Sequence, residues 1–307
     1  MNKHFPVSLF VFKRPSTTKV IFDLIANSGI SKVYVFADGP RDSREKTETD
    51  KVKKVINSFI SSNPSITVVA KYSHANQGLQ RSITTGLNKL FQKEEAVIIL
   101  EDDCLPSPDF FKFATAMLAK YADNDRIMSV AGTSVGSFGT NSYDFSRYQL
   151  CWGWATWRRA WLLYDPVMKE LGSPRWRAVI NRVTRYLHVR KYWWMMLNLV
   201  RSGWLKTWDY QWTYTLFMHN GLAVIPGSNL VSNIGFDDVA TNTKAKSNLS
   251  NMERQVLTWP LTHPKVIKDN ENLSHTIEAK FYNNPIAILG MLRQYIYWRW
   301  SIYAHRH

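Results

Sequence analysis

Hydrophobic and polar positions follow two different periods in turn along the first 131 residues. Runs of β-branched and aromatic residues have the length of strands and cover residues 7–12, 32–37, 66–72, 96–100 and 127–131. Between them, apolar residues recur every three or four positions, which predicts helices over residues 17–27, 45–61, 80–92 and 109–121. Strands that alternate with helices are joined by right-handed crossovers. We therefore predict an α/β fold with an open, mainly parallel twisted sheet and helices on both faces.

The pattern changes in the second half of the chain. Residues 222–226 predict one further strand, and residues 174–203 form a basic, aromatic stretch with helical periodicity. Residues 244–277 show no strong period. The tail over residues 286–300 is aromatic and basic, which suits either a helix packed on its own domain or a helix docked at a membrane surface.

These changes predict where the chain divides. We expect one sheet domain over residues 1–245, followed by a helical extension over residues 246–307. Within the sheet domain, we expect residues 1–132 to bind a nucleotide and residues 133–245 to bind the second substrate.

One predicted strand ends in three consecutive acids. Glu101, Asp102 and Asp103 directly follow the apolar residues 96–100. Ligands of parallel sheets gather at the carboxyl ends of the strands. Three adjacent carboxylates repel one another unless a cation or hydrogen-bond donors compensate their charge. A divalent cation such as Mn²⁺ or Mg²⁺ fits this pattern, and so does a solvated acidic turn.

Three further loops project from the same edge of the predicted sheet. Arg14 follows the first strand, Asp38 follows the second, and Gly78 and Arg81 lie between the third strand and its helix. An Arg can hold a phosphate, an Asp can accept a hydrogen bond from a base or a ribose, and a Gly allows a ligand to approach the backbone. Asp38, followed by Gly39 and a proline, also fits an ordinary turn. The chain has neither GxGxxG nor GxxxxGKS/T, which argues against a dehydrogenase-type dinucleotide site and a P-loop.

Tryptophans and one acid mark the second half. Trp152 and Trp154 belong to an aromatic stretch whose flat rings could stack on sugars or fill a core. Asp209 lies among the aromatic residues Trp208 to Trp212, where loss of solvent would raise its pKa toward that of a useful general base. It could also cap the helix that follows.

Composition and charge restrict the class of protein. The chain has 307 residues, of which 45% are hydrophobic and 21% charged, as in a folded globular protein. Its net charge is +15, and most of the excess lies after residue 150, which suits an anionic partner such as a nucleotide diphosphate, a nucleic acid or an anionic membrane.

The cysteines and the apolar runs bear on the compartment. Cys104 and Cys151 are the only cysteines, so neither a disulfide framework nor a zinc cluster is supported. Residues 5–12 read as a strand and not as a signal peptide, and no apolar run approaches the length of a membrane helix. We expect a cytoplasmic protein that contacts the inner membrane face, if at all, through its C-terminal tail.

Taken together and in chain order, these motifs resemble GT-A fold glycosyltransferases. The shared features are the Arg-Pro after the first strand, Asp38 to Pro40, Glu101 to Asp103 with residues 108–111, Gly153-Trp154, residues 208–212 and residues 232–235. The chain is similar to bacterial family 2-like sugar transferases and, more distantly, to N-acetylglucosaminyltransferase I. The resemblance covers about residues 5–242.

The resemblance implies a metal-dependent hexosyl- or N-acetylhexosaminyltransferase with a GT-A fold. It would move a sugar from a nucleotide-diphosphate donor, with a UDP-sugar favoured, to a carbohydrate or lipid-linked acceptor with inversion. Such an enzyme would serve polysaccharide or glycolipid synthesis. No nucleic acid partner is expected.

The resemblance also implies a role for each matching residue. On the donor side, the nucleotide would contact Arg14, Gly78 and Arg81. The nucleobase would contact Asp38, and the ribose would contact Asp102. The reacting groups would be Glu101 at the donor sugar, Asp103 as the ligand of Mn²⁺ or Mg²⁺, and Asp209 as the catalytic base. The acceptor would contact Trp152, Trp154 and Trp212.

Two departures from the family pattern bear on these roles. Related proteins can carry two adjacent acids where this chain has Asp209 followed by Tyr and Gln, so the base could lie a residue or two away. Many relatives place a His near the end of the domain, where this chain has Asn242. Metal binding would then be weaker, or supported by Asp237 or Asp238.

Three other classes of protein are compatible with parts of the sequence. A nucleotidyltransferase would need a Gly-rich phosphate loop near the N-terminus, which the chain lacks. A basic protein that binds a membrane or a nucleic acid would use the +15 charge, although the acids after a buried strand speak against it. A sugar-nucleotide-binding protein with weak catalysis stays open because of Asn242.

Overall fold

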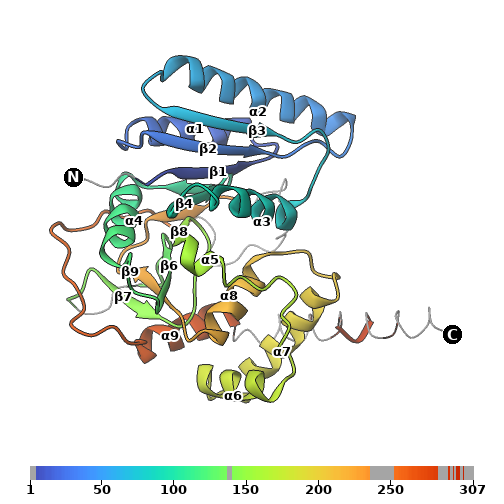
Figure 1. The fold of residues 1–307 in the computed structure, drawn as a ribbon, viewed down its shortest axis with the longest axis vertical. Helices are drawn as coiled ribbons and strands as arrows, with labels where there is room; N and C mark the ends of the chain where they lie inside the picture. The colour runs from blue at the N-terminus through green and yellow to red at the C-terminus, as the bar shows by residue number, and fades with distance from the viewer. Residues whose placement is uncertain are drawn as a thin grey trace.

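The computed structural model describes residues 5–136, 140–235 and 252–282, together with Gly290, Arg293, residues 295–297 and Trp300. Its centre is an eight-stranded sheet with the order β3-β2-β1-β4-β8-β6-β9-β7 (Figure 1). The strands are β1 (Val7–Val11), β2 (Lys32–Ala37), β3 (Thr67–Tyr72), β4 (Ala96–Glu101), β6 (Ile127–Ala131), β7 (Tyr143–Ser146), β8 (Trp154–Trp157) and β9 (Leu222–Pro226). A separate pair joins β5 (Cys104–Pro106) to β10 (Val231–Asn233) in antiparallel register.

The predicted sheet is confirmed as open and mainly parallel. Strands β1 to β4 are mutually parallel, and β6 and β9 run in the same direction. Only β8, inserted between β4 and β6, and β7, at the edge beside β9, run the opposite way. The antiparallel strands β7 and β8 were not predicted, because both are only four residues long and β8 reads as part of the tryptophan stretch.

Helices cover both faces of the sheet (Figure 1). They are α1 (Pro15–Ala26), α2 (Ser43–Ser62), α3 (Leu79–Leu90), α4 (Pro108–Lys120), α5 (Arg158–Trp161), α6 (Pro174–Val183), α7 (Leu187–Arg201), α8 (Asp209–Met218) and α9 (Glu271–Ile277), and α9 continues into a π-helical turn, η1 (Glu278–Tyr282). The first four coincide with the predicted helices to within about two residues at each end.

Two hydrophobic clusters lie on the two faces of the sheet. In β1, Val7, Leu9 and Val11 belong to one cluster and Phe10 to the other. One cluster includes side chains of α1, α2 and α4, and the other includes those of α3 and α5 to α9. Strands buried on both faces need apolar residues at every position, which explains the uninterrupted runs in β1, β2 and β4.

The described C-terminal part forms one short helix that packs on the sheet domain. Residues 271–277 form α9, which Asn270 caps by accepting a hydrogen bond from the N–H of Leu273 at 3.1 Å. Leu273 and Ile277 belong to the same cluster as α7 and α8. The described part of the predicted extension therefore packs directly on the sheet domain.

Most of the predicted tail over residues 286–300 lies outside the described residues, and its contact with a membrane stays a prediction. In the part of the chain that the structure describes, no helix is both long and apolar enough to cross a bilayer.

Candidate functional site

The acids at the end of β4 meet the arginine that follows β1. Arg14 Nη1 lies 3.0 Å from Asp102 Oδ1 and 3.1 Å from Asp103 Oδ2. The N–H of Phe12 also donates to Asp102 Oδ2 at 2.8 Å. These contacts form because β1 and β4 are adjacent and in register, with Phe10 opposite Glu101. Arg14 therefore compensates two of the three carboxylates, and its predicted contact with a nucleotide stays a prediction.

Two of the three carboxyl groups, those of Glu101 and Asp102, have raised pKa values. Burial, and next the charge of Asp103, raise the pKa of Asp102 to about 6, although Arg14 opposes the shift. Burial followed by the charges of Asp103, Asp102 and Asp209 also raises the pKa of Glu101. No described residue donates a hydrogen bond to the Glu101 carboxylate. This edge of the sheet is therefore an anionic site that a cation or a hydrogen-bond donor of a ligand would stabilise.

Asp209 lies at the start of α8 and acts on the same site. After burial and the charges of Asp103 and Asp102, the charge of Asp209 also raises the pKa of Glu101 at the end of β4. Burial raises the pKa of Asp209 itself, and hydrogen bonds from the Thr207 hydroxyl and from backbone N–H groups oppose that shift. Trp208 holds the N-cap position of α8, and Asp209 is the first residue of the helix. Its carboxylate still accepts hydrogen bonds from backbone N–H groups of the first turn, so the alternative in which Asp209 caps this helix stays open.

Asp38 lies at the end of β2, where it anchors the loop before α3. Its Oδ1 accepts hydrogen bonds from the N–H groups of Gly39 and Gln77 at 2.8 Å, and its Oδ2 accepts from Asn76 Nδ2 and the Gly78 N–H at 3.1 Å. The carboxylate thus fixes the loop, and its contact with a nucleobase stays a prediction.

Close packing and backbone conformation require glycine at two positions of these loops. A Cβ on Gly39 would lie 2.5 Å from the carbonyl carbon of Ala75, so the two loops pass too closely for any side chain. Gly78 has φ of 75°, in the left-handed region that favours glycine, immediately before α3 begins. Arg81 is exposed in the first turn of that helix.

Glu45 is a residue of this edge that was not predicted. It accepts hydrogen bonds from Lys13 Nζ at 3.0 Å, and from Arg41 N and Nε at 3.0 and 2.9 Å. It therefore ties the loop after β1 to the loop after β2, and the contact with Arg41 lowers its pKa to about 2. Asp42, which caps α2, stands three residues before it, and this capping-box spacing is the signal that could have revealed it.

A cavity of about 180 Å³ lies beside Asp209. Its walls come from segments far apart in the sequence, and the lining residues are Thr133, Gln149, Leu150, Cys151, Trp152, Tyr192, Trp193, Asp209, Tyr210, Thr213, Phe281 and Tyr282. Of the three predicted acceptor residues, only Trp152 is among them. Asp209 was predicted as the base, and the other cavity residues were missed because no local pattern connects α7, α8 and η1.

Trp154 and Trp212 do not fit the predicted contact with an acceptor. They are 1% and 0% exposed, and both belong to a hydrophobic cluster. The ring of Trp154 stacks on Trp208 at 5.0 Å, and the ring of Trp212 lies 5.4 Å from Trp161. Because β8 is a central strand of the sheet, Trp154 is buried under the helices, and both rings form core.

The side chains at the end of β4 bear on the metal site that the resemblance implies. Within the described ranges, no group of three or more His, Cys, Asp or Glu side chains is placed to hold a metal ion. Mg²⁺ often uses only one or two carboxylates together with substrate phosphates, and Asp103 fits such a role. The backbone at Gly235 passes so close that a Cβ there would lie 2.3 Å from Asp103 Oδ2. Asp237, Asp238 and Asn242 lie outside the described residues.

No known family model matches this chain. No curated protein matches it either.

Solved structures do share part of its arrangement of strands and helices. A mannosyltransferase from Pyrobaculum calidifontis, in complex with GDP-Man and Mn²⁺, is 12% identical with a TM-score of 0.39, over 70% of this chain and 69% of its own. A 4-diphosphocytidyl-2C-methyl-D-erythritol synthase from Anaerococcus prevotii is 13% identical with a TM-score of 0.34, over 56% and 77%. A UDP-glucose pyrophosphorylase complexed with UDP-glucose is 11% identical with a TM-score of 0.28, over 48% and 64%. At TM-scores below 0.5, these similarities assign neither a family nor an activity to this chain.

Proposed function

We propose that this protein transfers a sugar from a nucleotide-diphosphate donor to a hydroxyl group of an acceptor, with Asp209 as the general base. One observation carries the proposal. Asp209 lines the cavity, and its charge also reaches Glu101 at the carboxyl end of β4. A base in this position lines a space for one substrate, and its charge acts on the end of the strand where a second substrate would bind.

The donor would bind across the loops that follow β1, β2 and β4. Arg14, Lys13 and Arg41 supply positive charge at this edge, and hydrogen bonds to carboxylates hold all three in place. Asp103 would hold Mn²⁺ or Mg²⁺ together with oxygens of the diphosphate. When bound, the ion would neutralise charge on the leaving diphosphate. A UDP-sugar is the donor we favour, on the resemblance in sequence.

The proposed transfer moves one proton and displaces one leaving group. The oxygen of the acceptor hydroxyl attacks the anomeric carbon, and its proton passes to the carboxylate of Asp209. The bond from that carbon to the diphosphate oxygen breaks, and the electron pair leaves with the nucleoside diphosphate. Burial raises the pKa of Asp209, which makes it a stronger base than an ordinary aspartate. A single displacement of this kind inverts the anomeric centre.

The test compares the wild type with the Asp209→Asn variant. We expect one nucleoside diphosphate to stabilise both proteins in thermal melts with Mn²⁺, by about 2.7 kcal/mol when it is present at 100 times its dissociation constant. Release of nucleoside diphosphate from the matching sugar nucleotide should fall about 10² to 10⁴-fold in the variant, because the base is lost and the shape is kept. The proposal fails if no nucleotide stabilises the wild type, or if the variant transfers sugar at the wild-type rate.

A further inference from the structure

We propose that the cavity beside Asp209 receives one uncharged sugar ring of the acceptor, and that Phe281 and Tyr282 of η1 form one of its walls. The inference rests on the proposed function, because Asp209 is taken as the base that receives the proton of the bound sugar's hydroxyl. It adds the class of the acceptor, the number of rings bound and the part of the chain that completes the site.

The size of the cavity limits its occupant. A cavity of about 150 Å³ is large enough to hold benzene, a six-membered ring. The cavity beside Asp209 has about 180 Å³, which leaves room for one six-membered ring with some of its substituents and not for a second ring. Any further sugars of a longer acceptor must therefore lie outside it.

Gln149 and Trp193, which line the cavity, each carry a buried polar atom that lacks a partner among the described residues. Gln149 is 4% exposed, and its Nε2 donates to Thr213 Oγ1 at 3.3 Å while its Oε1 makes no hydrogen bond. Trp193 Nε1 is likewise a buried donor without an acceptor. A buried polar group left unpaired costs roughly 1–3 kcal/mol. A sugar hydroxyl can both donate and accept, so a ring bound beside Gln149 and Trp193 would offer these residues a polar partner that the described residues do not.

The aromatic lining suits a ring with one apolar face. Tyr192, Trp193 and Tyr210 contribute from α7 and α8, and Phe281 and Tyr282 contribute from η1. The hydroxyl groups of Tyr192 and Tyr210 bond to each other at 2.6 Å, which holds these two rings in position. Rigid aromatic rings offer a large contact area to the C–H face of a sugar at low entropic cost.

Charge excludes acidic sugars. Among the described residues that line the cavity, Asp209 alone carries a full charge at neutral pH. Burial raises the pKa of the Cys151 thiol, so this residue stays neutral. The carboxylate of a uronic acid would therefore meet one like charge in a desolvated space, with no cation among the described lining residues to compensate it. A neutral hexose or N-acetylhexosamine avoids this cost.

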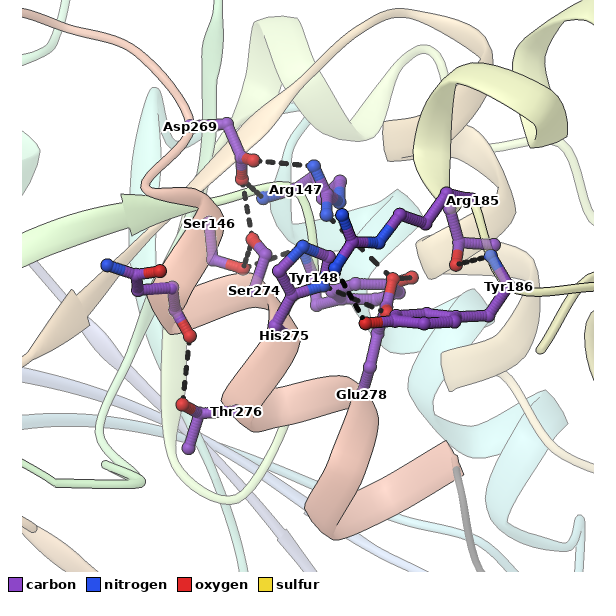
Figure 2. A network of polar contacts seen from close by, with 12 residues as sticks. Ser146, Arg147, Tyr148, Arg185, Tyr186, Asp269, Ser274, His275, Thr276 and Glu278 are labelled. Atoms are coloured by element: carbon purple, nitrogen blue, oxygen red, sulfur yellow. Dashed lines mark hydrogen bonds and ion pairs between the residues drawn. The ribbon is translucent and has the colours of Figure 1, made fainter.

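A polar network fixes the segment that supplies the last wall. Figure 2 shows Arg147 and Tyr148, which follow β7, directed at Asp269 and Glu278 of the C-terminal segment. Arg147 Nη1 bonds to Asp269 Oδ2 at 2.7 Å, and the Tyr148 hydroxyl donates to Glu278 Oε1 at 2.5 Å. Glu278 is 2% exposed and lies three residues before Phe281. Glu278 is therefore a positioning residue for the wall.

The experiment measures saturation transfer by NMR from the protein to small neutral sugars. The probes are the methyl glycosides of glucose, galactose, mannose and N-acetylglucosamine, with methyl glucuronide as the charged counterpart. The variants are Gln149→Leu and Phe281→Ala, and the matched control is Gln211→Leu. Gln211 is equally buried and also has an unpaired Oε1, but it does not line the cavity. Thermal melts verify that each protein is folded.

We expect at least one neutral glycoside to bind the wild type and the Gln211→Leu control, and to bind at least tenfold more weakly to Gln149→Leu and Phe281→Ala. Methyl glucuronide should show no transfer. The inference is overturned if no neutral glycoside binds the wild type, if the glucuronide binds equally well, or if both cavity variants that fold keep full affinity. If Gln149→Leu does not fold, Phe281→Ala decides.

A separate titration with nucleoside diphosphates and Mn²⁺ distinguishes failure of this inference from failure of the proposed function. Nucleotide binding and sugar transfer without binding of any neutral glycoside would overturn the inference about the cavity alone. Binding of a neutral glycoside to the wild type without any nucleotide binding would overturn the transferase proposal and leave a sugar site.

Discussion

At the scale of single residues, opposing influences set the basicity of Asp209. Burial raises its pKa, and the hydroxyl of Thr207 together with backbone N–H groups of the first turn of α8 lowers it. A general base must be ionised to accept a proton, so the balance between these influences decides the pH below which the proposed reaction stops.

Removing the hydroxyl of Thr207 should move that pH upward. In the Thr207→Val variant, Asp209 loses a donor that stabilises its ionised form, and its pKa rises further. Transfer is lost as the pH falls through this pKa, so the acidic limb of the kcat/KM profile should shift to higher pH than in the wild type. The matched control is Thr215→Val, because Thr215 bonds to the backbone of Gln211 and not to Asp209. An unchanged limb in Thr207→Val would contradict the role of Asp209 as base.

A second residue-scale prediction concerns Gly235, which lies against Asp103. A methyl group in Gly235→Ala would lie 2.3 Å from Asp103 Oδ2, so either the carboxylate or the loop after β10 must move. We expect metal-dependent nucleotide affinity to fall about tenfold, which corresponds to about 1.4 kcal/mol. Titration calorimetry with a nucleoside diphosphate and Mn²⁺ measures the effect. Gly290→Ala is the control, since no heavy atom lies within 4 Å of its added methyl group. Equal losses in both variants would exclude a specific role for Asp103.

At the scale of secondary structure, helices α5 and α8 and strand β8 share a layer of tryptophan rings. Trp154, Trp161, Trp208 and Trp212 contact one another through ring centroids 5.0 to 6.2 Å apart. This layer holds α8, and with it Asp209, against the sheet. The layer is therefore core that positions the residue proposed as the base, and its rings are not exposed for contact with a sugar.

Truncation of this layer should cost stability. Trp212 is 0% exposed, and a Trp212→Ala variant loses its dispersion contacts and leaves a cavity, for which about 3–5 kcal/mol is typical. Urea unfolding measures the change. Trp204→Ala is the control, because Trp204 is 44% exposed and its loss should cost far less. If Trp212→Ala were as stable as the control, the core assignment would be wrong.

The sequence predicts elements well where burial dictates every residue. Strands β1, β2, β4 and β6 are buried at nearly all positions, so their apolar runs are unmistakable. The edge formed by Arg14, Asp102 and Asp103 could also be predicted, because parallel neighbours end at the same edge. The partnership of Asp38 with the loop over residues 76–78 could not, since it depends on backbone donors that no side-chain pattern encodes.

The rest of the site could not be predicted, because its residues lie far apart in the sequence. Phe281 and Tyr282 reach the cavity through a seven-residue helix and one π-helical turn, which are too short for a periodic signal. The sequence around Trp154 and Trp212 does not distinguish core tryptophans from tryptophans that bind sugars. Only the pairing of β8 with both β4 and β6 reveals that Trp154 is core.

At the scale of the whole molecule, the two proposed substrates bind to parts of different origin. The donor edge comes from loops within the first 103 residues, and the cavity comes from the loop after β6, the segment before β8, α7, α8 and η1. Asp209 stands between them. Changes in the C-terminal segment should therefore affect one substrate and not the other.

The Glu278→Gln variant tests this separation. Removing the charge weakens the contacts of residue 278 with Arg147 and His275, and loosens η1. We expect affinity for a neutral methyl glycoside to fall several-fold while nucleotide affinity is unchanged, as measured by NMR and calorimetry. Glu271→Gln, an exposed position in α9, is the control. Equal weakening of both ligands in Glu278→Gln would indicate general unfolding and contradict the proposed separation.

The bond from Tyr148 to Glu278 spans 130 residues, and this distance matters while the chain is being made. Chains emerge from the ribosome with the N-terminal part first, and the early strands can fold before the later ones are synthesised. The Arg14, Asp102 and Asp103 edge can thus assemble while residue 278 has not yet been added. Until then, Phe281 and Tyr282 do not exist to close the cavity. If the cavity binds the acceptor as proposed, selection of the acceptor requires residues 278–282 to have been synthesised, whereas the proposed donor edge can form on a nascent chain.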